Sequence, residues 1–247
     1  MLKITGISKS FWGIKATNNV SIELKPNSIN ALIGPNGAGK TTIFNLITGK
    51  ISIDEGKIFI GNNNITNLKE TEITHLGIAR AFQITNIFPT LSVKESIKMA
   101  LLAKIHGLNN MWDRFSSHSV NEEANNIAEL TGLKKVYNTI SSELSHGDLK
   151  LLDIAIAWAL KPKVLLLDEP TAGMGPEERW EMIKRIKELW QKTKMTVLFI
   201  EHDMDIVFDI AQTIFVLQQG AVIAKGTPKE IKKNQAVIKA YLGGGKK

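Results

Sequence analysis

The chain has 247 residues, of which 43% are hydrophobic and 22% are charged, and it contains no cysteine. These values are ordinary for a globular protein with one substantial core, arranged in one or two lobes. They exclude disulfides and thiolate metal sites, and the longest apolar runs are too short to cross a bilayer. The first residues lack the apolar segment of a signal peptide, so we expect no export from the cytosol.

The formal net charge of +7 has three candidate explanations, namely nucleic acid, anionic lipid, or a basic surface around an anionic ligand. The lysines are scattered or occur in short pairs, and no basic stretch is interleaved with aromatic residues. Such interleaving is typical of proteins that stack on bases. We therefore expect an anionic ligand and no direct contact with nucleic acid.

The first third of the chain has the pattern of short strands separated by turns. The strand-like runs are residues 4–7, 20–24, 29–33 and 57–60. This spacing predicts antiparallel hairpins together with one strand that leads into a glycine-rich loop.

The glycine-rich loop reads GPNGAGKTT over residues 34–42, directly after the apolar run 29–33. The spacing G-x-x-x-x-G-K-T is that of a phosphate-binding loop, in which glycines let backbone N–H groups point at a phosphate. Lys40 adds a positive charge for the β- and γ-phosphates, and Thr41 offers a hydroxyl to Mg²⁺. A helix beginning near Gly39 aims its N-terminus at the same anion. A glycine-rich turn without function is the alternative, but the strand-loop-helix context favours nucleotide binding.

The middle of the chain, from about residue 84 to 142, changes to helical periodicity. Helices are predicted over residues 92–103 and 122–130, and Ser119 with Glu122 forms a candidate capping box for the second. Residues 106–119 are polar and mixed, which indicates an irregular connection. The block is predicted to be a helical insertion.

The last third alternates helices and apolar strands. A helix opens at Ser145, strands are predicted over residues 164–167, 195–200 and 214–217, and a helix between them has Trp180 and Trp190 on one side. We expect these tryptophans in the core or an interface rather than on a ligand. Strand-helix alternation of this kind predicts a mostly parallel sheet covered on both faces.

Acidic residues follow one predicted strand and a histidine follows another. Asp168 and Glu169 come directly after the apolar run 164–167, at the sheet edge where ligands collect in α/β folds. The first carboxylate suits Mg²⁺ and the second suits a water that attacks phosphate. His202 follows a neighbouring strand, where it can reach the same crevice, although a lone histidine is often structural. Gln83, at the entrance to the helical block, is a candidate sensor of metal and γ-phosphate.

The order of these motifs resembles the ATP-binding subunit of ABC transporters over nearly the whole chain. Residues 34–42 are similar to the Walker A loop, Gln83 to the Q-loop residue, residues 144–148 (LSHGD) to the signature motif, and residues 164–169 (VLLLDE) to the Walker B strand with its catalytic glutamate. Residues 171–175 are similar to the D-loop, His202 to the switch histidine, and Phe11 to the aromatic residue that stacks on adenine, with Trp12 as the alternative. The segments GIARAFQ, FIEHDMDIV and VIKAYLG resemble the subunit of the branched-chain amino-acid uptake branch.

The resemblance implies a P-loop NTPase core with a mostly parallel sheet, an N-terminal antiparallel β subdomain and an inserted helical subdomain. It implies a core lobe of residues 1–83 and 160–247 and a helical or signature lobe of residues 84–159. The implied cofactors are ATP and Mg²⁺. Three residues, Thr41, Gln83 and Asp168, would hold the metal. Lys40, Glu169 and His202 would act in catalysis. The implied nucleotide contacts are Phe11, Asn36, Gly37, Ala38, Gly39, Lys40, Thr41, Thr42, Gln83, Ser145, His146 and Gly147.

The resemblance also implies an assembly. Two ATPase subunits, identical or different, would dimerise head to tail around two Mg-ATP molecules. They would drive transmembrane permease subunits from the cytoplasmic face of the inner membrane, with an indirect link to a solute-binding protein. The segment 84–89, which follows Gln83 and contains three bulky apolar residues, would receive a permease helix; packing between lobes is its alternative interpretation.

The chain departs from the family pattern at three positions. His146 replaces the first glycine of the signature, and it either crowds the γ-phosphate of the opposite subunit or donates to it. Asp148 replaces a glutamine, and a helix cap with Ser145 is an equally good interpretation. Gly175 replaces the Asp or Asn of the D-loop, which leaves open how the two ATP sites communicate.

Two alternative functions remain at the level of sequence. Importers of urea or short amides have similar sequences. A non-transport ABC protein, acting as a binding switch in translation or DNA maintenance, is less well supported, because such relatives carry two cassettes or a long coiled-coil insertion.

Overall fold

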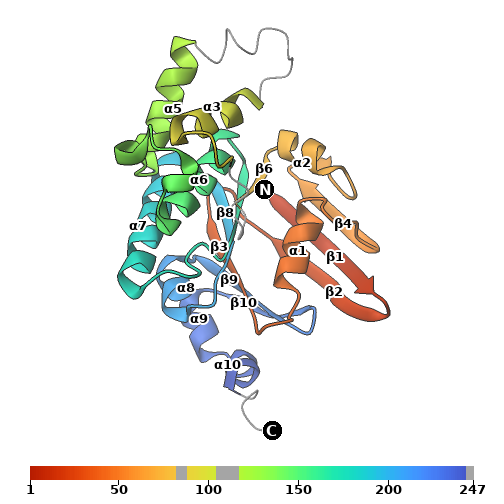
Figure 1. The fold of residues 1–247 in the computed structure, drawn as a ribbon. Helices are drawn as coiled ribbons and strands as arrows, with labels where there is room; N and C mark the ends of the chain where they lie inside the picture. The colour runs from red at the N-terminus through yellow and green to blue at the C-terminus, as the bar shows by residue number, and fades with distance from the viewer. Residues whose placement is uncertain (82–87, 104–116, 243–247) are drawn as a thin grey trace.

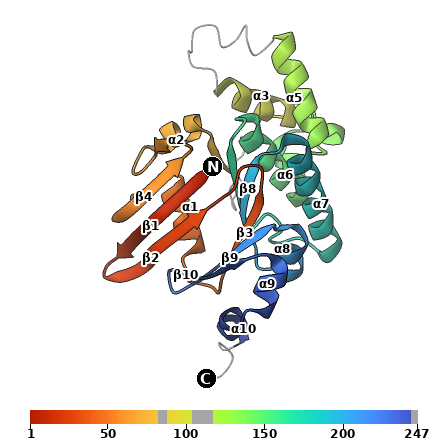
Figure 2. The ribbon, with the colours of Figure 1, turned by 180° about the vertical axis from the view of Figure 1, so that it is seen from behind.

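The computed structural model describes residues 1–81, 88–103 and 117–242. In this part of the chain, an antiparallel sheet packs against one side of a larger sheet, and a group of helices covers the other side (Figure 1). The view from behind shows the same layers, with the two sheets meeting around helix α1 (Figure 2).

The antiparallel sheet has four strands in the order β2-β1-β4-β5. They are β1 (Leu2–Phe11), β2 (Ile14–Glu23), β4 (Glu55–Ile60) and β5 (Asn63–Asn64). At the start of β1 the buried Leu2 and Ile4 alternate with the exposed Lys3 and Thr5, which is the period of a strand with one face in the core. The predicted hairpins are confirmed, with longer strands than the apolar runs indicated.

The larger sheet has six strands in the order β10-β9-β3-β8-β7-β6, and only the β9–β10 pair is antiparallel. The strands are β3 (Ile29–Ile33), β6 (Ile78–Ala81), β7 (Val164–Asp168), β8 (Thr196–Ile200), β9 (Thr213–Gln218) and β10 (Ala221–Gly226). Every residue of β3, β7 and β8 is buried, because layers cover both faces of these central strands. The predicted mostly parallel sheet is confirmed.

The helices that the structure describes connect these strands or form a group beside them. They are α1 (Lys40–Ile47), α2 (Glu70–Leu76), α3 (Val93–Ala103), α5 (His118–Leu130), α6 (His146–Ala159), α7 (Pro176–Thr193), α8 (Met204–Ile210), α9 (Pro228–Lys233) and α10 (Gln235–Leu242). None of these helices combines the length and the apolar character needed to cross a membrane.

Two hydrophobic clusters hold the layers together. One lies between α1, the antiparallel sheet and one face of the larger sheet, where Leu32, Leu166 and Leu198 contribute. The other lies between the opposite face of that sheet and helices α3, α5, α6, α7 and α8. Neighbours along the central strands, such as Leu165 and Leu166, point into different clusters because successive side chains alternate between faces. The helical group therefore shares its core with the parallel sheet.

The helical group differs from prediction at the start of α5. The cap is Ser117, whose hydroxyl accepts a hydrogen bond from the N–H of Val120 at 3.4 Å. Ser119 lies inside the helix, so the predicted capping box of Ser119 and Glu122 is wrong. The helix begins about one turn earlier than predicted, because its first turn adds a single buried apolar residue, Val120, which is too little to extend the periodic pattern.

The two tryptophans of α7 have different environments. Trp190 is partly buried and packs against the larger hydrophobic cluster, as predicted. Trp180 is 47% exposed and lies outside the core of this chain, so for this residue the interface alternative stays a prediction. It lies on the first turns of α7, which extend toward solvent beside the loop before Gly175.

Candidate functional site

The glycine-rich loop connects β3 to α1, as the sequence predicted. Gly39 is the N-cap of α1 and has a φ of 101°. A Cβ atom at this position would lie 2.4 Å from the carbonyl oxygen of Ala16, so only glycine fits. Gly49, with a φ of 73°, follows the last turn and confirms the predicted helix end.

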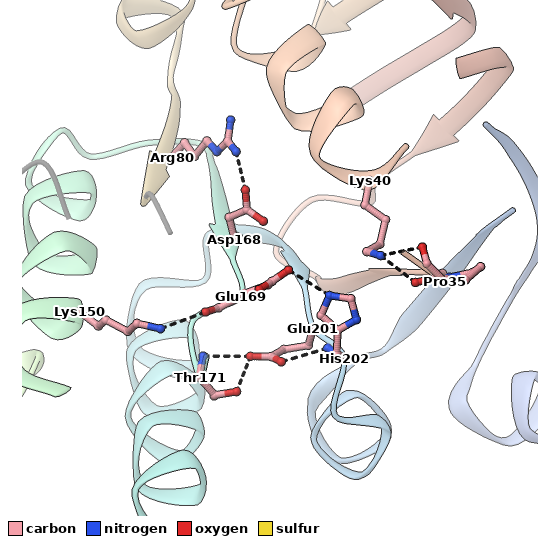
Figure 3. A network of polar contacts seen from close by, with 10 residues as sticks. Pro35, Lys40, Arg80, Lys150, Asp168, Glu169, Thr171, Glu201 and His202 are labelled. Carbon is pink, nitrogen blue, oxygen red and sulfur yellow. Dashed lines mark hydrogen bonds and ion pairs between the residues drawn. The ribbon is translucent and has the colours of Figure 1, made fainter. Parts of the chain in front are cut away.

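Lys40, the first residue of α1, is directed into the loop that precedes it. Its ammonium group donates hydrogen bonds to the carbonyl oxygens of Gly34 at 2.7 Å and Pro35 at 3.1 Å (Figure 3). Burial lowers the pKa of Lys40, and the negative charges of Glu169 and Asp168 oppose that shift. The loop thus holds the Lys40 ammonium group near two carboxylates at the end of β7, on the same edge of the parallel sheet.

The other loop residues predicted to contact the nucleotide differ in their exposure to solvent. Asn36, Gly37 and Thr41 are exposed, Thr42 is half-buried and Ala38 is buried. Residues 35–38 line one side of a hollow of about 370 Å³, together with Gln218, Gln219 and two residues of α10. The exposed loop is therefore accessible to a ligand on this side.

Glu169 and His202 meet where two neighbouring parallel strands end. Asp168 of β7 pairs with Ile200 of β8, so the next residues of both strands leave the sheet side by side. His202 Nε2 lies 2.9 Å from Glu169 Oε1 (Figure 3). Glu169 has a φ of 49°, which is uncommon for a residue with a side chain and typical of functional sites. The structure brings these two predicted residues together.

Glu201 organises the backbone around this pair, and the sequence analysis did not select it. One of its carboxylate oxygens accepts hydrogen bonds from the Thr171 N–H at 2.9 Å and from the Thr171 hydroxyl. The other oxygen accepts from the His202 N–H at 3.1 Å. Glu201 is 5% exposed, and it joins the loop after β7 to the loop after β8. The signal for Glu201 in the sequence was a carboxylate directly after the apolar run 197–200.

Asp168 is paired with Arg80 of β6, another residue that the sequence analysis did not select. Arg80 Nη2 contacts Asp168 Oδ2, and both side chains are almost inaccessible to solvent. The second carboxylate oxygen, Oδ1, is buried and has no hydrogen-bond partner among the residues that the structure describes. A charged residue within the short apolar strand before Gln83 was the available signal, because a buried charge needs a partner.

Lys150 connects the helical group to the loop after β7. It lies on α6, and its ammonium group donates to the carbonyl oxygen of Glu169 at 3.2 Å (Figure 3). It also donates to the carbonyl oxygen of Ala172 at 2.6 Å. Burial lowers its pKa, while Glu201, Glu169 and Asp153 oppose the shift. Lys150 therefore holds the Glu169 backbone from one side, while His202 contacts the Glu169 side chain from the other side.

Ser145, His146 and Gly147 form the beginning of α6. Ser145 is the N-cap: its hydroxyl accepts from the Asp148 N–H at 3.1 Å and donates to the Asp148 carboxylate at 2.8 Å. The capping interpretation of Asp148 is confirmed. The imidazole of His146 lies beside Gly173, in the loop between β7 and α7 of the same chain, since a Cβ atom there would be 3.3 Å from His146 Nε2.

Gly175 is the N-cap of α7, with a φ of −66° that any residue can adopt. Its N–H donates to the Glu178 carboxylate at 3.0 Å, and Pro176 is the first helical residue. Glu178 thus supplies one half of a capping box, whereas Gly175 has no side chain to accept from the N–H groups of the first turn.

Phe11 and Trp12 lie at the turn between β1 and β2. The Phe11 ring is 37% exposed with Lys9 above it, and Trp12 is fully exposed at a φ of 45°. Both rings are available for stacking. Gln83, the predicted metal sensor, and residues 84–87 of the predicted docking segment lie outside the described residues.

The residues present fit a nucleotide and a divalent cation. The unpaired Oδ1 of Asp168 is a hard oxygen ligand of the kind Mg²⁺ prefers, and Thr41 supplies an exposed hydroxyl. The phosphate loop supplies a helix N-terminus and a cation for phosphate.

The fold and this site define a P-loop nucleotide-binding protein with a carboxylate and a histidine at the adjacent strand ends. The family described as "ABC transporter" matches residues 17–172, and the chain belongs to that family. A second family, described as "Branched-chain amino acid ATP-binding cassette transporter", matches residues 221–247.

Curated relatives are similar along nearly the whole chain. The high-affinity branched-chain amino acid transport ATP-binding protein LivG of Escherichia coli is 38% identical over 98% of both chains. The protein BraF of Pseudomonas aeruginosa, described in the same words, is 35% identical over 98% of both chains.

Solved structures agree with the fold. A nucleotide-free ATP-binding cassette from an ABC transporter has a TM-score of 0.85 and 32% identity, with 98% of both chains covered. A dimeric ATP-binding cassette in a post-hydrolysis state with ADP and Pi has a TM-score of 0.78 and 25% identity, covering 92% of this chain and 99% of that one. The expected P-loop core, antiparallel subdomain and helical subdomain are confirmed, and the chain is an ABC ATPase.

Proposed function

We propose that this ABC ATPase is the subunit that drives a branched-chain amino-acid importer. The observation that supports hydrolysis most directly is the contact of 2.9 Å between Glu169 and His202, beside a lysine of the phosphate loop. A carboxylate that can accept a proton from water, held in place by a histidine, is suited to promote attack of water on a γ-phosphate.

We assign a role to each residue of the proposed site. Lys40 binds the phosphates, Glu169 orients and polarises the attacking water, and His202 holds Glu169 and contacts the γ-phosphate. Phe11 stacks on adenine, with Trp12 as the alternative. Thr41, Gln83 and Asp168 hold Mg²⁺, which when bound neutralises charge that develops on the phosphate oxygens.

We propose that Ser145, His146 and Gly147 act on the nucleotide of a second ATPase subunit in a head-to-tail dimer. In this chain Ser145 bonds within α6 and His146 lies beside Gly173, and among the described residues none of the three is hydrogen-bonded to the phosphate loop. A signature helix whose N-terminal residues have no hydrogen bond to their own phosphate loop among the described residues can act on a partner's phosphate. The second subunit is either another copy or a different chain.

The proposed assembly has a membrane partner. Residues 1–83 with 160–247 form the nucleotide-binding lobe, and residues 84–159 form the lobe that receives a permease helix. Phe88 supports docking at this place, because it is 54% exposed at the start of the helical block. The chain would then lie on the cytoplasmic face of the inner membrane, linked through the permease to a solute-binding protein.

The solute is tested by reconstituting this subunit with the permease and the solute-binding protein that assemble with it. Vesicles that contain ATP should accumulate leucine, isoleucine or valine, and the same vesicles with the Glu169→Gln variant should not. Uptake of urea or acetamide in place of leucine would assign the other solute class and contradict the amino-acid proposal. Hydrolysis without uptake of any of these solutes would contradict the transport role.

A further inference from the structure

Arg80 and Asp168 form a buried ion pair between two neighbouring strands. Arg80 lies on β6 and Asp168 ends β7, and these strands pair in parallel register. The guanidinium contacts Asp168 Oδ2, with side-chain exposures of 6% and 2%. Figure 3 shows the arginine reaching the carboxylate from the side opposite to Glu169 and His202. A charge pair this deep is stable only while both partners are present.

The phosphate-loop helix holds the other side of the arginine. Arg80 Nη1 donates to Asn45 Oδ1 at 2.7 Å, and the guanidinium lies over the ring of Phe44 at 5.4 Å from its centroid. Both residues belong to α1, which begins at Lys40. Because a guanidinium is planar and its donors have fixed directions, these contacts orient the N–H groups that face Asp168.

The ion pair leaves one oxygen of Asp168 for another ligand. Oδ2 contacts Arg80, whereas Oδ1 is buried and without a hydrogen-bond partner among the described residues. A cation on Oδ1 would therefore share a carboxylate with a guanidinium. Repulsion between such close positive charges is strong where water screens them poorly.

We propose that Arg80 is a positioning residue that neutralises Asp168 and prevents this carboxylate from binding a divalent cation in the absence of nucleotide. The cation then binds together with ATP, because the phosphate oxygens add enough negative charge to overcome the repulsion by Arg80. This inference rests on the proposed role of Asp168 as a metal ligand.

The test uses Mn²⁺ as the probe and follows its binding to the full-length, nucleotide-free protein by electron paramagnetic resonance. Arg80→Gln should bind Mn²⁺ at least about tenfold more tightly than wild type, because one repelling charge is gone. The double variant Arg80→Gln with Asp168→Asn should lose the gain. Arg80→Lys keeps the charge and should remain close to wild type. Asn45→Ala is the matched control, since it removes a bond to Arg80 and leaves the charge in place.

Three results would overturn the inference. The first is a folded Arg80→Gln protein with wild-type Mn²⁺ affinity, and the second is an equal gain in Asn45→Ala. The third result needs no Arg80 variant. It is that the nucleotide-free wild type binds Mn²⁺ tightly and that this binding is lost in Asp168→Asn.

A separate measurement tests the proposed function on which the inference rests. If Asp168→Asn leaves the affinity for Mn²⁺ in the presence of ATP unchanged, Asp168 is not a metal ligand and the proposed site itself is wrong. If Asp168→Asn weakens Mn²⁺ binding in the presence of ATP, but Arg80→Gln leaves the Mn²⁺ affinity of the nucleotide-free protein unchanged, then only the role proposed for Arg80 is wrong.

Discussion

Glu169 and His202 are separated by 33 positions in the chain and contact each other through Oε1 and Nε2 at 2.9 Å. The contact exists because β7 and β8 are neighbours in parallel register and both end at the same edge of the sheet. The Glu169 backbone is held in addition by Lys150, and the His202 backbone by Glu201. Supported from both strands, the pair has the fixed geometry that a water-activating carboxylate needs.

Glu169→Gln should retain ATP binding and lose steady-state turnover by about a hundredfold or more, the range for removal of a catalytic base. Calorimetry on the subunit measures ATP affinity, and phosphate release by the assembled complex measures turnover. Glu188→Gln changes an exposed glutamate of α7 and should leave both values unchanged. Near wild-type turnover in Glu169→Gln would remove this residue from the chemistry.

Lys40→Ala should weaken ATP binding by at least about tenfold, because a charge-assisted hydrogen bond to phosphate is lost. Lys50→Ala, an exposed lysine close to the other end of the same helix, is the control and should bind ATP as the wild type does. Equal ATP affinities for Lys40→Ala and wild type by calorimetry would show that Lys40 lies outside the site.

His146→Gly should leave ATP binding by the isolated subunit unchanged, because the subunit's own phosphate loop binds the nucleotide. Only dimer-dependent hydrolysis should change. His146→Ala controls for the lower helix propensity of glycine, which costs up to about 1 kcal/mol. A large loss of nucleotide affinity in both variants would mean that the contact of His146 with the region of Gly173 supports the local fold instead.

Lys150 should make stability rise with pH in the alkaline range. Burial lowers the pKa of Lys150 in the folded protein. Between that lowered pKa and about pH 10.4, the ordinary pKa of lysine, the unfolded chain therefore binds more protons at this group than the folded chain does. The contribution of Lys150 to the free energy of unfolding therefore increases as pH rises toward that value. Lys150→Met should show a shallower rise in urea titrations at several pH values.

Lys229→Met removes an exposed lysine of α9 and is the control variant, which should have wild-type stability at neutral pH. Lys150→Met should also lose stability at neutral pH by about 1–3 kcal/mol, since two carbonyl groups lose their donor. Identical pH slopes in wild type and Lys150→Met would contradict the lowered pKa.

Phe88→Asp should abolish assembly with the permease and spare ATP binding by the free subunit, because a charge replaces an exposed apolar side chain at the proposed docking site. Co-purification from membranes measures assembly. Phe88→Leu preserves the apolar surface and should assemble normally. A folded Phe88→Asp subunit recovered with the permease at wild-type yield would contradict docking at this residue.

Local chemistry alone was enough to predict the phosphate loop. Gly39, Lys40 and Thr41 act within one loop and one helix end, so their spacing in the chain determines their arrangement in space. The same holds for the cap formed by Ser145 and Asp148, and for the mostly apolar, fully buried strands β3, β7 and β8. The start of α5 was not predicted correctly, because its cap at Ser117 is a polar contact and the spacing of apolar residues carries no information about polar contacts.

The tertiary structure decided which distant residues meet. Nothing in the chain order places β8 between β3 and β7, or puts Arg80 beside an aspartate 88 positions away. Strand order in a parallel sheet follows from the packing of helices on both faces, and that packing depends on side chains from the whole chain. The sequence therefore determined the types of group available for phosphate chemistry. The sheet decided that Glu169 meets His202, that Glu201 joins their loops, and that Asp168 keeps one oxygen free of Arg80.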